Sequence, residues 1–392
     1  MQPLQGTVQH YPWGTTDAIP ALLGVPADGR PFAEYWLGAH RLAPSVLDGS
    51  PLDEVLRLRP DYLGPAPQRA FGTQLSFLMK VLSARHALSV QAHPSREQAE
   101  DGFARENAAG IALDAPERTY RDTWPKPEIL IAIDEFHTLS GFREPLATAE
   151  LFDQLGVAGQ LSSIIGPLTA RKGPAALAEV FLDVLSLSGD RARLFELVCA
   201  AAMEKQDAPG ELGAFARTVI ELDEVFPADP GILAALLLNR VVLQPGEALY
   251  VPAGVLHAHL RGTGVEVMGN SDNVIRGGLT NKHVDVGELV GVVEFAATEP
   301  QIVRPEAVSP GVTHYPTPCP EFDVWRIAPD GARTLVPGDG SARVVLVLSG
   351  TLELHQGGDT VSLGQGGAAF LPAQRESVIA TGDGLAFLTA SG

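Results

Sequence analysis

The sequence predicts a mainly β protein that is interrupted by an α-helical insert. Glycine and proline are frequent, with 41 and 31 positions among the 392 residues, and this favours short strands and many turns over a helical bundle. Short apolar runs typical of strands lie on both sides of a central region with helical periodicity. A hydrophobic content of 45% and a charged content of 19% are typical of a globular protein with an ample core.

The first part of the chain, residues 1–145, is predicted to be rich in strands and loops. The predicted strands are Ser76–Leu82, Leu88–Gln91 and Glu128–Ile133. The polar stretch between Pro94 and Asn107 predicts a helix, because Ser95 and Gln98 have the spacing of a capping box.

Residues 146–240 change character and predict an α-helical domain inserted into the β structure. Apolar side chains recur there at the spacing of one helix face. They are Leu194, Leu197, Val198, Ala201 and Ala202 in one stretch, and Leu212, Phe215, Ala216, Val219 and Ile220 in another. We expect the insert to end with the segment Pro230–Asn239.

From Arg240 onward the strand pattern returns, and one part of it occurs twice. The segment Val241–Gly254 predicts strand, turn, strand and turn, and Val361–Ala373 repeats it with the same spacing between glycine and proline. The first copy is followed by His257, whereas the second has Ser377 at the matching place. This pattern resembles the cupin jelly roll, a barrel that holds a metal ion in its mouth.

The cupin resemblance implies two jelly-roll barrels and one α-helical domain. Residues 1–145 and 241–300 would form a discontinuous, metal-bearing catalytic barrel, with residues 146–240 as the helical insert. Residues 301–392 would form a degenerate C-terminal barrel that has lost its metal ligand.

The segment Leu88–Pro94 indicates a metal site. Gln91 and His93 are two residues apart in an alternating apolar run, so on a strand both side chains would face one side. The chain later offers the carboxylate of Glu128 and the imidazole of His257. Together they form a mixed nitrogen and oxygen ligand set that suits zinc or a similar divalent ion and leaves room for a water or substrate oxygen.

The bulk properties exclude several classes of partner. The formal net charge of −19 argues against nucleic acid and anionic membranes, and it means that an anionic substrate needs local Lys and Arg in its pocket. Cys199 and Cys319 lie far apart and indicate no disulfide framework, which fits a reducing cytoplasm. No signal peptide and no apolar run long enough to span a bilayer are evident. We expect a cytoplasmic protein, either a monomer or a weak homodimer.

Five segments carry a further resemblance. They are Tyr11–Gly14, Ala33–His40, Phe77–Leu82 running into Gln91–Pro94, Lys126–Glu128, and Val265–Met268 continuing through Ser271–Asp285. In this order they are similar to the type I mannose-6-phosphate isomerases, also called phosphomannose isomerases. The resemblance implies a zinc-dependent enzyme that interconverts mannose 6-phosphate and fructose 6-phosphate through a cis-enediol.

The family resemblance also implies particular site residues. One zinc ion per chain would be bound by four side chains. These are Gln91, His93, Glu128 and His257. Arg276 corresponds to the family's active-site arginine. One departure is Pro125, which stands where many bacterial members have a histidine that has been considered for proton transfer.

Moving a proton between C1 and C2 of a sugar requires an acid or base, stabilisation of the developing enediolate, and an anchor for phosphate. Glu266 is the first candidate for the base, and Asp272 is the second. Arg276 suits either phosphate or enediolate oxygens, and both roles remain open. Lys80 and Lys126 are lone cations in otherwise apolar stretches. We therefore expect Lys126 to act in catalysis and Lys80 to contact the substrate.

Four more residues are predicted to contact the substrate. They are Trp13, Glu34, Ser89 and Lys282. Core packing explains Trp13 almost as well, and Lys282 is equally consistent with a solvated turn.

Two other functions remain open at this point. A sugar-phosphate-binding regulatory or scaffold protein that descends from such an enzyme would fit the loss at Pro125. Another metal-dependent cupin enzyme, such as an oxygenase or an epimerase, would share the fold. The complete ligand set and the paired lysines favour the isomerase.

Overall fold

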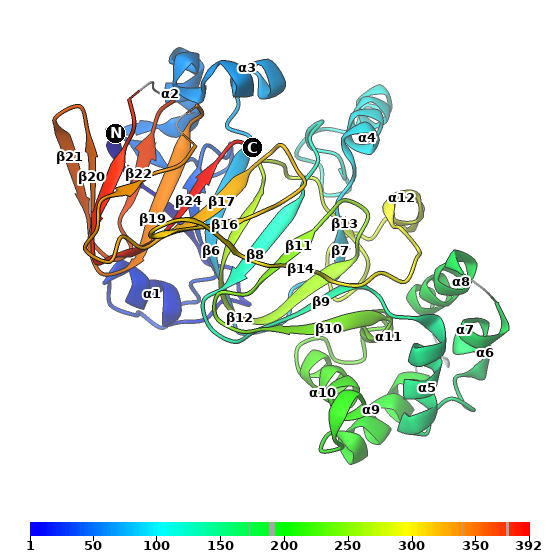
Figure 1. Cartoon of the computed structure of the whole chain (residues 1–392). Helices are drawn as coiled ribbons and strands as arrows, with labels where there is room; N and C mark the ends of the chain where they lie inside the picture. Colours follow the sequence, from blue (N-terminus) through cyan, green and yellow to red (C-terminus); the bar gives the residue numbers. More distant parts are fainter. Residues whose placement is uncertain (172, 188–192, 339, 374–375) are drawn as a thin grey trace.

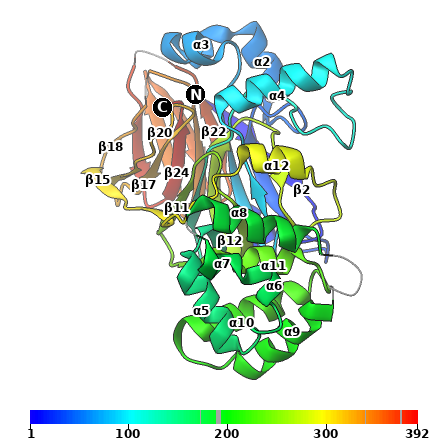
Figure 2. The same ribbon diagram turned by 90° about the vertical axis from the view of Figure 1, so that its right-hand side faces the viewer.

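The computed structural model describes residues 1–392 except 172, 188–192, 339 and 374–375. The protein is mainly β with several helices, as predicted. The β sheets occupy one side of the molecule and most of the helices gather at the other (Figure 1). In the view turned by 90°, the helical group lies below the sheets and faces the viewer (Figure 2). No helix in the described ranges is long and apolar enough to cross a membrane.

A central sheet carries the candidate site. Its strands are β2 Thr7–Gln9, β3 Glu34–Gly38, β6 Phe77–Ala84, β7 Gln91–Ala92, β8 Glu128–Ala132, β9 Phe136–Phe142, β10 Leu238–Leu243, β11 Ala248–Val251, β12 His257–Gly269, β13 Ile275–Arg276 and β14 Gln301–Val303. The main path runs β14-β11-β8-β12-β6-β3-β2, and the other strands pair beside it. The long strand β12 pairs with β6, β7, β8 and β9, so it brings distant segments together.

The C-terminal strands form a second large sheet and a small one. The large sheet contains β1 Gln2–Gln5, β4 Val46–Leu47, β5 Ser50–Pro51, β15 Glu306–Ser309, β16 Val312–Tyr315, β17 Asp323–Ile327, β19 Arg343–Ser349, β22 Ala368–Leu371 and β24 Leu385–Ala390. Its order is β15-β16-β17-β24-β19-β22-β1-β4-β5. The small sheet, in the order β18-β23-β20-β21, contains β18 Thr334–Leu335, β20 Leu352–Gln356, β21 Asp359–Leu363 and β23 Ile379–Gly382. Because β1 pairs with β22, the two ends of the chain share one sheet.

Helices occupy the predicted insert and a few connections. The insert contains α5 Pro145–Leu155, α6 Ser162–Ile165, α7 Pro167–Ala170, α8 Pro174–Leu185, α9 Arg193–Lys205, α10 Gly210–Asp223 and α11 Gly231–Leu236. The others are α1 Ala18–Leu23, α2 Leu52–Leu58, the short 3-10 helix η1 Pro60–Leu63, α3 Pro65–Phe71, α4 Arg96–Ala108 and α12 Val286–Val292. Both predicted amphipathic stretches are helical, as α9 and α10.

Local sequence signals explain most element boundaries near the site. Helix α4 begins after Ser95, whose hydroxyl accepts from the backbone of Gln98 while the Gln98 side chain accepts from the Ser95 backbone, so the predicted capping box is confirmed. The predicted strands at Ser76–Leu82 and Glu128–Ile133 correspond to β6 and β8.

The predicted strand Leu88–Gln91 is wrong for its first three residues, because β7 contains only Gln91 and Ala92. The backbone of Leu88 donates to His259 and that of Val90 to Gly278. The backbone of this segment therefore forms hydrogen bonds to two different chain segments, and it does not pair with one strand along a regular ladder.

Two apolar cores flank the central sheet. One lies between the central and the C-terminal sheets and includes Phe77, Val265 and Phe370. The other joins the helical insert to β9 and β12, with Phe142 and Phe181 among its members. A smaller apolar cluster with Leu82 and Leu130 lies on the opposite face of β6 and β8, so polar side chains on that face are held in a packed setting.

Candidate metal centre and substrate cleft

Three side chains from separate segments meet in a buried cluster. His93 follows β7, Glu128 begins β8 and His257 begins β12, and all three are buried. The Nε2 atom of His93 lies 3.1 Å from Oε1 of Glu128, and Nε2 of His257 lies 3.1 Å from Oε2. Both Nε2 atoms and Oε2 of Glu128 are nevertheless buried without a hydrogen bond. Orphaned polar atoms are costly unless a further group binds them, so a divalent cation fits this donor set.

The two histidines are held in the tautomer that ligation requires. Nδ1 of His93 lies 2.9 Å from the carbonyl oxygen of Asn273, and Nδ1 of His257 lies 3.2 Å from that of Val255. A carbonyl only accepts, so each Nδ1 carries the proton and each Nε2 presents its lone pair to the cluster. Burial lowers the pKa of His93 to about 4, which keeps the imidazole neutral.

Gln91 lies beside this cluster, although it makes no hydrogen bond to it. In the β7–β12 ladder Gln91 is the cross-strand partner of His257. Directly opposed residues in an antiparallel pair have their side chains on the same face. The amide oxygen of Gln91 can therefore complete the ligand set from that face.

Lys126 stabilises the carboxylate of the cluster. Its Nζ lies 3.0 Å from Oε1 of Glu128. Burial alone would raise the pKa of Glu128, but the charge of Lys126 outweighs this and holds that pKa well below its ordinary value. Glu128 is therefore ionised, as a metal ligand must be.

A second polar network lies next to the metal cluster and centres on Lys80. Its Nζ donates to Oε2 of Glu266 at 2.7 Å and to Oε1 of Glu34 at 3.2 Å. Trp36 Nε1 donates to the other oxygen of Glu34, and His259 Nε2 lies 3.2 Å from Oε1 of Glu266. All five side chains are buried, so the lysine is fixed by two carboxylates.

The charges in this network hold one another in place. Burial alone would lower the pKa of Lys80 and raise that of Glu266. The carboxylates of Glu266 and Glu34 outweigh burial and raise the pKa of Lys80, while Lys80 holds the pKa of Glu266 at about 2. Both groups are therefore charged at neutral pH.

The substrate cleft consists of two adjoining cavities. One has a volume of about 670 Å³ and includes Lys80, Lys126 and Asp272 in its lining. The other has a volume of about 510 Å³ and includes Trp13, Ser89 and Gln91. The linings share Tyr11, Arg276, Asn281 and Lys282, so the cavities meet at these residues. Five predicted residues are outside both linings: Glu34 and Glu266, which contact Lys80, and the ligand candidates His93, Glu128 and His257.

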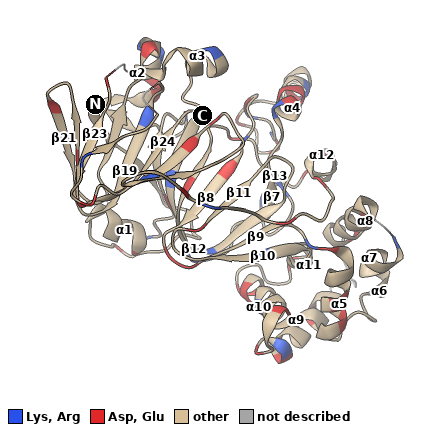
Figure 3. Ribbon diagram, viewed as in Figure 1, with Lys and Arg blue, Asp and Glu red and all other residues tan. Residues whose placement is uncertain are grey.

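A cluster of cations lies where the cavities meet. Burial, together with the charge of Arg121, lowers the pKa of Arg276, and burial with the charges of Arg276 and Arg121 lowers that of Lys282. Among the described residues, none of these three cations forms an ion pair with a carboxylate; Arg121 donates to the carbonyl oxygens of Leu113 and Ala115. Elsewhere acidic and basic residues are spread along the ribbon (Figure 3). Unpaired cations in a cleft of a protein with net charge −19 are suited to binding an anion.

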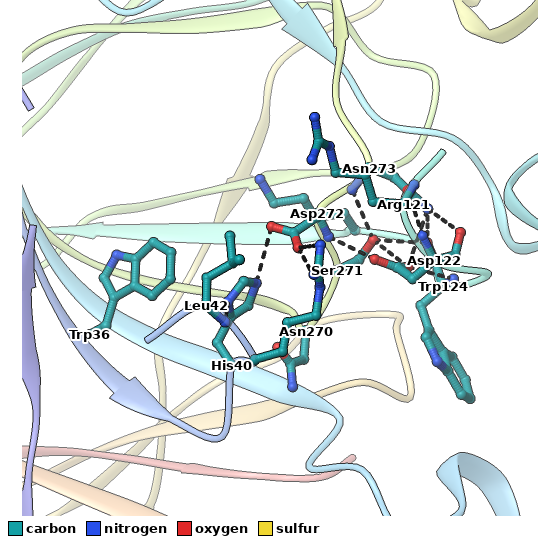
Figure 4. A network of polar contacts seen from close by, with 12 residues as sticks. Trp36, His40, Leu42, Arg121, Asp122, Trp124, Asn270, Ser271, Asp272 and Asn273 are labelled. Carbon is teal, nitrogen blue, oxygen red and sulfur yellow. Dashed lines mark hydrogen bonds and ion pairs between the residues drawn. The ribbon is translucent and has the colours of Figure 1, made fainter. Parts of the chain in front are cut away.

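Asp272 lies on the wall of the larger cavity, in the loop between β12 and β13. One of its oxygens lies 3.3 Å from Nε2 of His40, and the other lies 2.9 Å from Arg41 (Figure 4). Burial would raise the pKa of Asp272, but the hydrogen bond from His40 and the charge of Arg41 outweigh it and lower that pKa. Asp272 is therefore an ionised carboxylate that borders the cleft.

The sequence interpretation missed several residues that shape this site. His40 and Asn273 lie inside segments that carry the family resemblance, so their positions were available but their contacts were not. Arg121 and Asp122 lie in a polar turn before Trp124, where sequence patterns predict only a solvated loop.

The sequence is similar to known proteins along its whole length. Residues 1–145 match the family described as phosphomannose isomerase type I, catalytic domain. Over 394 residues the chain is 34% identical to the mannose-6-phosphate isomerase of Escherichia coli (strain K12), with 98% of each chain covered. It is 30% identical to mannose-6-phosphate isomerase 2 of Arabidopsis thaliana, with 96% of this chain and 90% of that one covered.

The fold is similar to solved structures in the same way. The crystal structure of a Salmonella typhimurium mannose 6-phosphate isomerase bound to its substrate fructose 6-phosphate and to zinc has a TM-score of 0.91 at 33% identity. The alignment covers 100% of this chain and 99% of that one. A mannose 6-phosphate isomerase bound with zinc and yttrium matches with the same TM-score, 0.91, at 34% identity and the same coverage.

Proposed function

This chain belongs to the family of type I mannose-6-phosphate isomerases, and we propose that its cleft interconverts D-mannose 6-phosphate and D-fructose 6-phosphate with one zinc ion. The observation that carries the proposal is a buried set of ligand atoms beside a cleft that holds unpaired cations. The orphaned ligand atoms belong to His93, Glu128 and His257. Lys126, which contacts Glu128, and Gln91, which is paired with His257, both line the cleft, as do Arg276 and Lys282. Gln91 and Arg276 are also cross-strand partners, so the metal-ligand set and the cations are held by adjacent backbone positions.

In this proposal Gln91, His93, Glu128 and His257 hold the zinc ion. When bound, zinc supplies Lewis-acid polarisation of the sugar's carbonyl and hydroxyl oxygens without a redox change. The protein keeps the ligands ready, because backbone carbonyls fix both imidazole tautomers and Lys126 keeps Glu128 ionised. Lys126 also borders the cleft, so its ammonium group can donate to a sugar oxygen beside the ligand set.

The phosphate group of the substrate binds to the cation cluster. The Arg276 guanidinium offers a fork of N–H donors that matches phosphate oxygens, and Lys282 adds a point charge. Ser89 lines the same cavity and offers a hydroxyl donor. A dianion at this place relieves the repulsion between the cations. The aromatic ring of Trp13 forms part of the wall beyond it.

The isomerisation moves a proton between C1 and C2 through a cis-enediol. Glu266 is the first candidate for the base, because it is ionised and one of its carboxylate oxygens lies within 4.8 Å of a carboxylate oxygen of Glu128 and of a ring nitrogen of His259. Asp272 is the second candidate, because it is ionised and borders the cavity directly. Lys80, held by Glu34 and Glu266, presents a positive charge to oxygens that become anionic in the enediolate.

A non-catalytic sugar-phosphate-binding role is the weaker alternative. A protein that had lost catalysis would be expected to lose its metal ligands or its charged network first, and both sets of residues are complete here. Pro125 stands where many family members have a histidine, and the charged side chains of Lys126 and Asp272 line the cleft.

Several structural expectations are part of the same proposal. Residues 1–145 and 241–300 would form the metal-bearing cupin barrel, residues 146–240 the helical insert, and residues 301–392 a degenerate barrel. The repeated segments lead into corresponding strands, β11 and β22, which supports this division. Both cysteines are free, which suits the cytoplasm. We propose a monomer or a weak homodimer, with no nucleic acid or membrane partner.

The proposed reaction can be tested with purified, zinc-loaded protein. Mannose 6-phosphate is supplied, and fructose 6-phosphate formation is followed with a coupled assay. Turnover that inorganic phosphate inhibits competitively supports both the reaction and the cation cluster. A folded, zinc-loaded protein that gives no turnover would contradict the proposed reaction and favour the non-catalytic binding role.

A further inference from the structure

A loop behind the metal cluster is held by one carboxylate. The loop Asn270–Asn273 follows β12, and Figure 4 shows it against the segment Arg121–Trp124. Oδ1 of Asp122 accepts from the backbone of Trp124 at 2.8 Å, from Oγ of Ser271 at 2.8 Å and from Nδ2 of Asn273 at 3.2 Å. Oδ2 accepts from the backbone of Asp272 at 2.9 Å. Asp122 therefore fixes three consecutive residues of the loop.

Asn273 connects this carboxylate to a metal ligand. Its side chain accepts from the backbone of Arg121 at 2.7 Å and donates to the carbonyls of Asp122 and Trp124 at 2.9 and 3.0 Å. Its own carbonyl oxygen lies 2.9 Å from Nδ1 of His93. The orientation of the His93 imidazole thus depends on a carbonyl that Asp122 and its segment hold in place.

The same segment leads directly to another metal ligand. Two residues after Trp124 comes Lys126, and Glu128 follows two residues later. The backbone of Gly269, just before the loop, donates to the carbonyl of Pro127 at 2.9 Å. The contact between loop and segment therefore sets the position of Glu128 relative to His93, although neither ligand touches Asp122.

We propose that Asp122 is a positioning residue for the metal centre, which sets the orientation of His93 through the loop Asn270–Asn273. All four groups around its carboxylate are donors, and an ionised carboxylate accepts from all of them. An asparagine has the same shape but must turn its NH₂ group toward either the three donors at Oδ1 or the backbone N–H of Asp272. Such a donor–donor contact displaces the loop. The inference rests on the proposed function only in naming zinc as the metal.

The test is the zinc affinity of Asp122→Asn, measured by competition with a chelator of known zinc affinity. Asp134→Asn is the matched control, because it removes the same charge and its Oδ1 also accepts a backbone hydrogen bond, from Thr263, at the end of β8 away from Glu128. Outer partners of metal-bound histidines typically contribute about 10- to 100-fold in affinity. We expect Asp122→Asn to bind zinc about tenfold more weakly than wild type, and Asp134→Asn to match wild type.

Ser271→Ala serves as a milder second variant, since it removes a single donor and keeps the charge. It should weaken zinc binding by a smaller factor in the same direction. Circular dichroism and the melting temperature of the zinc-free proteins establish that each variant is folded. Zinc affinity within twofold of wild type in a folded Asp122→Asn variant would overturn the inference. If wild type binds zinc but does not isomerise mannose 6-phosphate, the proposed function fails while this comparison still stands.

Discussion

At the scale of single residues, the cations of the site fall into two groups, those paired with carboxylates and those without such a partner. The cations Lys80 and Lys126 each lie against buried carboxylates, so their positions are fixed before a substrate enters. Arg276 and Lys282 have no such carboxylate among the described residues, and burial and neighbouring positive charges lower the pKa of both. The first pair is suited to the reacting oxygens and the second to a phosphate group.

The role of Arg276 can be measured from the KM and kcat for mannose 6-phosphate. Arg276→Ala should raise the KM for mannose 6-phosphate by about 10- to 100-fold, because charge-assisted hydrogen bonds to phosphate are worth about 1.5–3 kcal/mol. Arg217→Ala, at an exposed site on α10, is the control and should leave KM unchanged. A large fall in kcat with an unchanged KM would instead assign Arg276 to the enediolate.

The identity of the base is open to a paired comparison. Glu266→Gln should abolish proton exchange at C2, measured by NMR in deuterated water, while the bound zinc per chain stays at the wild-type value. Asp272→Asn should retain measurable exchange. The reverse pattern, with exchange lost only in Asp272→Asn, contradicts the assignment of Glu266 and supports the carboxylate at the cavity wall.

At the scale of elements, short sequence signals define the pieces that position the ligands. The capping box at Ser95 starts α4 two residues after His93, so the chain turns away from the cluster at a fixed place. The cross-strand pairing of Lys80 with Glu266 locks β6 to β12 from inside the fold. The sequence predicts the first of these features directly, from residue types and spacing.

The capping box makes a testable contribution to stability. Ser95→Ala should lower the free energy of unfolding by about 1 kcal/mol, since the first turn of α4 loses its side-chain acceptor. Ser95→Asp keeps an acceptor and should stay close to wild type. Denaturant titration of the zinc-free proteins measures both, and equal midpoints for Ser95→Ala and wild type would contradict the role of the cap.

The Lys80–Glu266 pair makes stability depend on pH in a defined direction. The pKa of Glu266 is about 2 in the folded protein against an ordinary value of 4.5, so its stabilisation is present above about pH 4.5 and is lost as pH falls toward 2. Wild type should exceed Glu266→Gln in stability by a similar margin at pH 7 and pH 5.5, and by less at pH 3.5. The exposed substitution Glu97→Gln is the control for the general effect of acid. A stability difference between wild type and Glu266→Gln that stays constant down to pH 3.5 would contradict a stabilising role for the Lys80–Glu266 pair.

At the scale of the whole molecule, the fold brings together residues that are distant in the chain. The metal cluster draws on positions 93, 128 and 257, and β12 is the strand that gathers them. The first strand of the chain pairs with β22 near the end, which sequence periodicity could not predict because that pairing is set by tertiary packing.

The sequence was informative where chemistry depends on residue type and local spacing. Such signals predict the strands β6 and β8 and the helices between residues 146 and 240. The ligand set stays a prediction, and the structure brings His93, Glu128 and His257 of that set together. The partners of Glu266 and the contacts of Asp122 were not, since each depends on cross-strand register or on loop packing between segments far apart. Leu88–Val90 was assigned to a strand because its apolar character does not distinguish a regular ladder from isolated backbone bonds.

One zinc ion per chain is expected to make this cleft active. The decisive measurement is a zinc titration of chelator-treated protein, with bound zinc and the rate of mannose 6-phosphate isomerisation recorded at each step. The rate should be absent without zinc, rise in proportion to bound zinc, and reach its plateau at one zinc per chain. Full activity in zinc-free protein, or a zinc-saturated and folded protein without activity, would contradict the account.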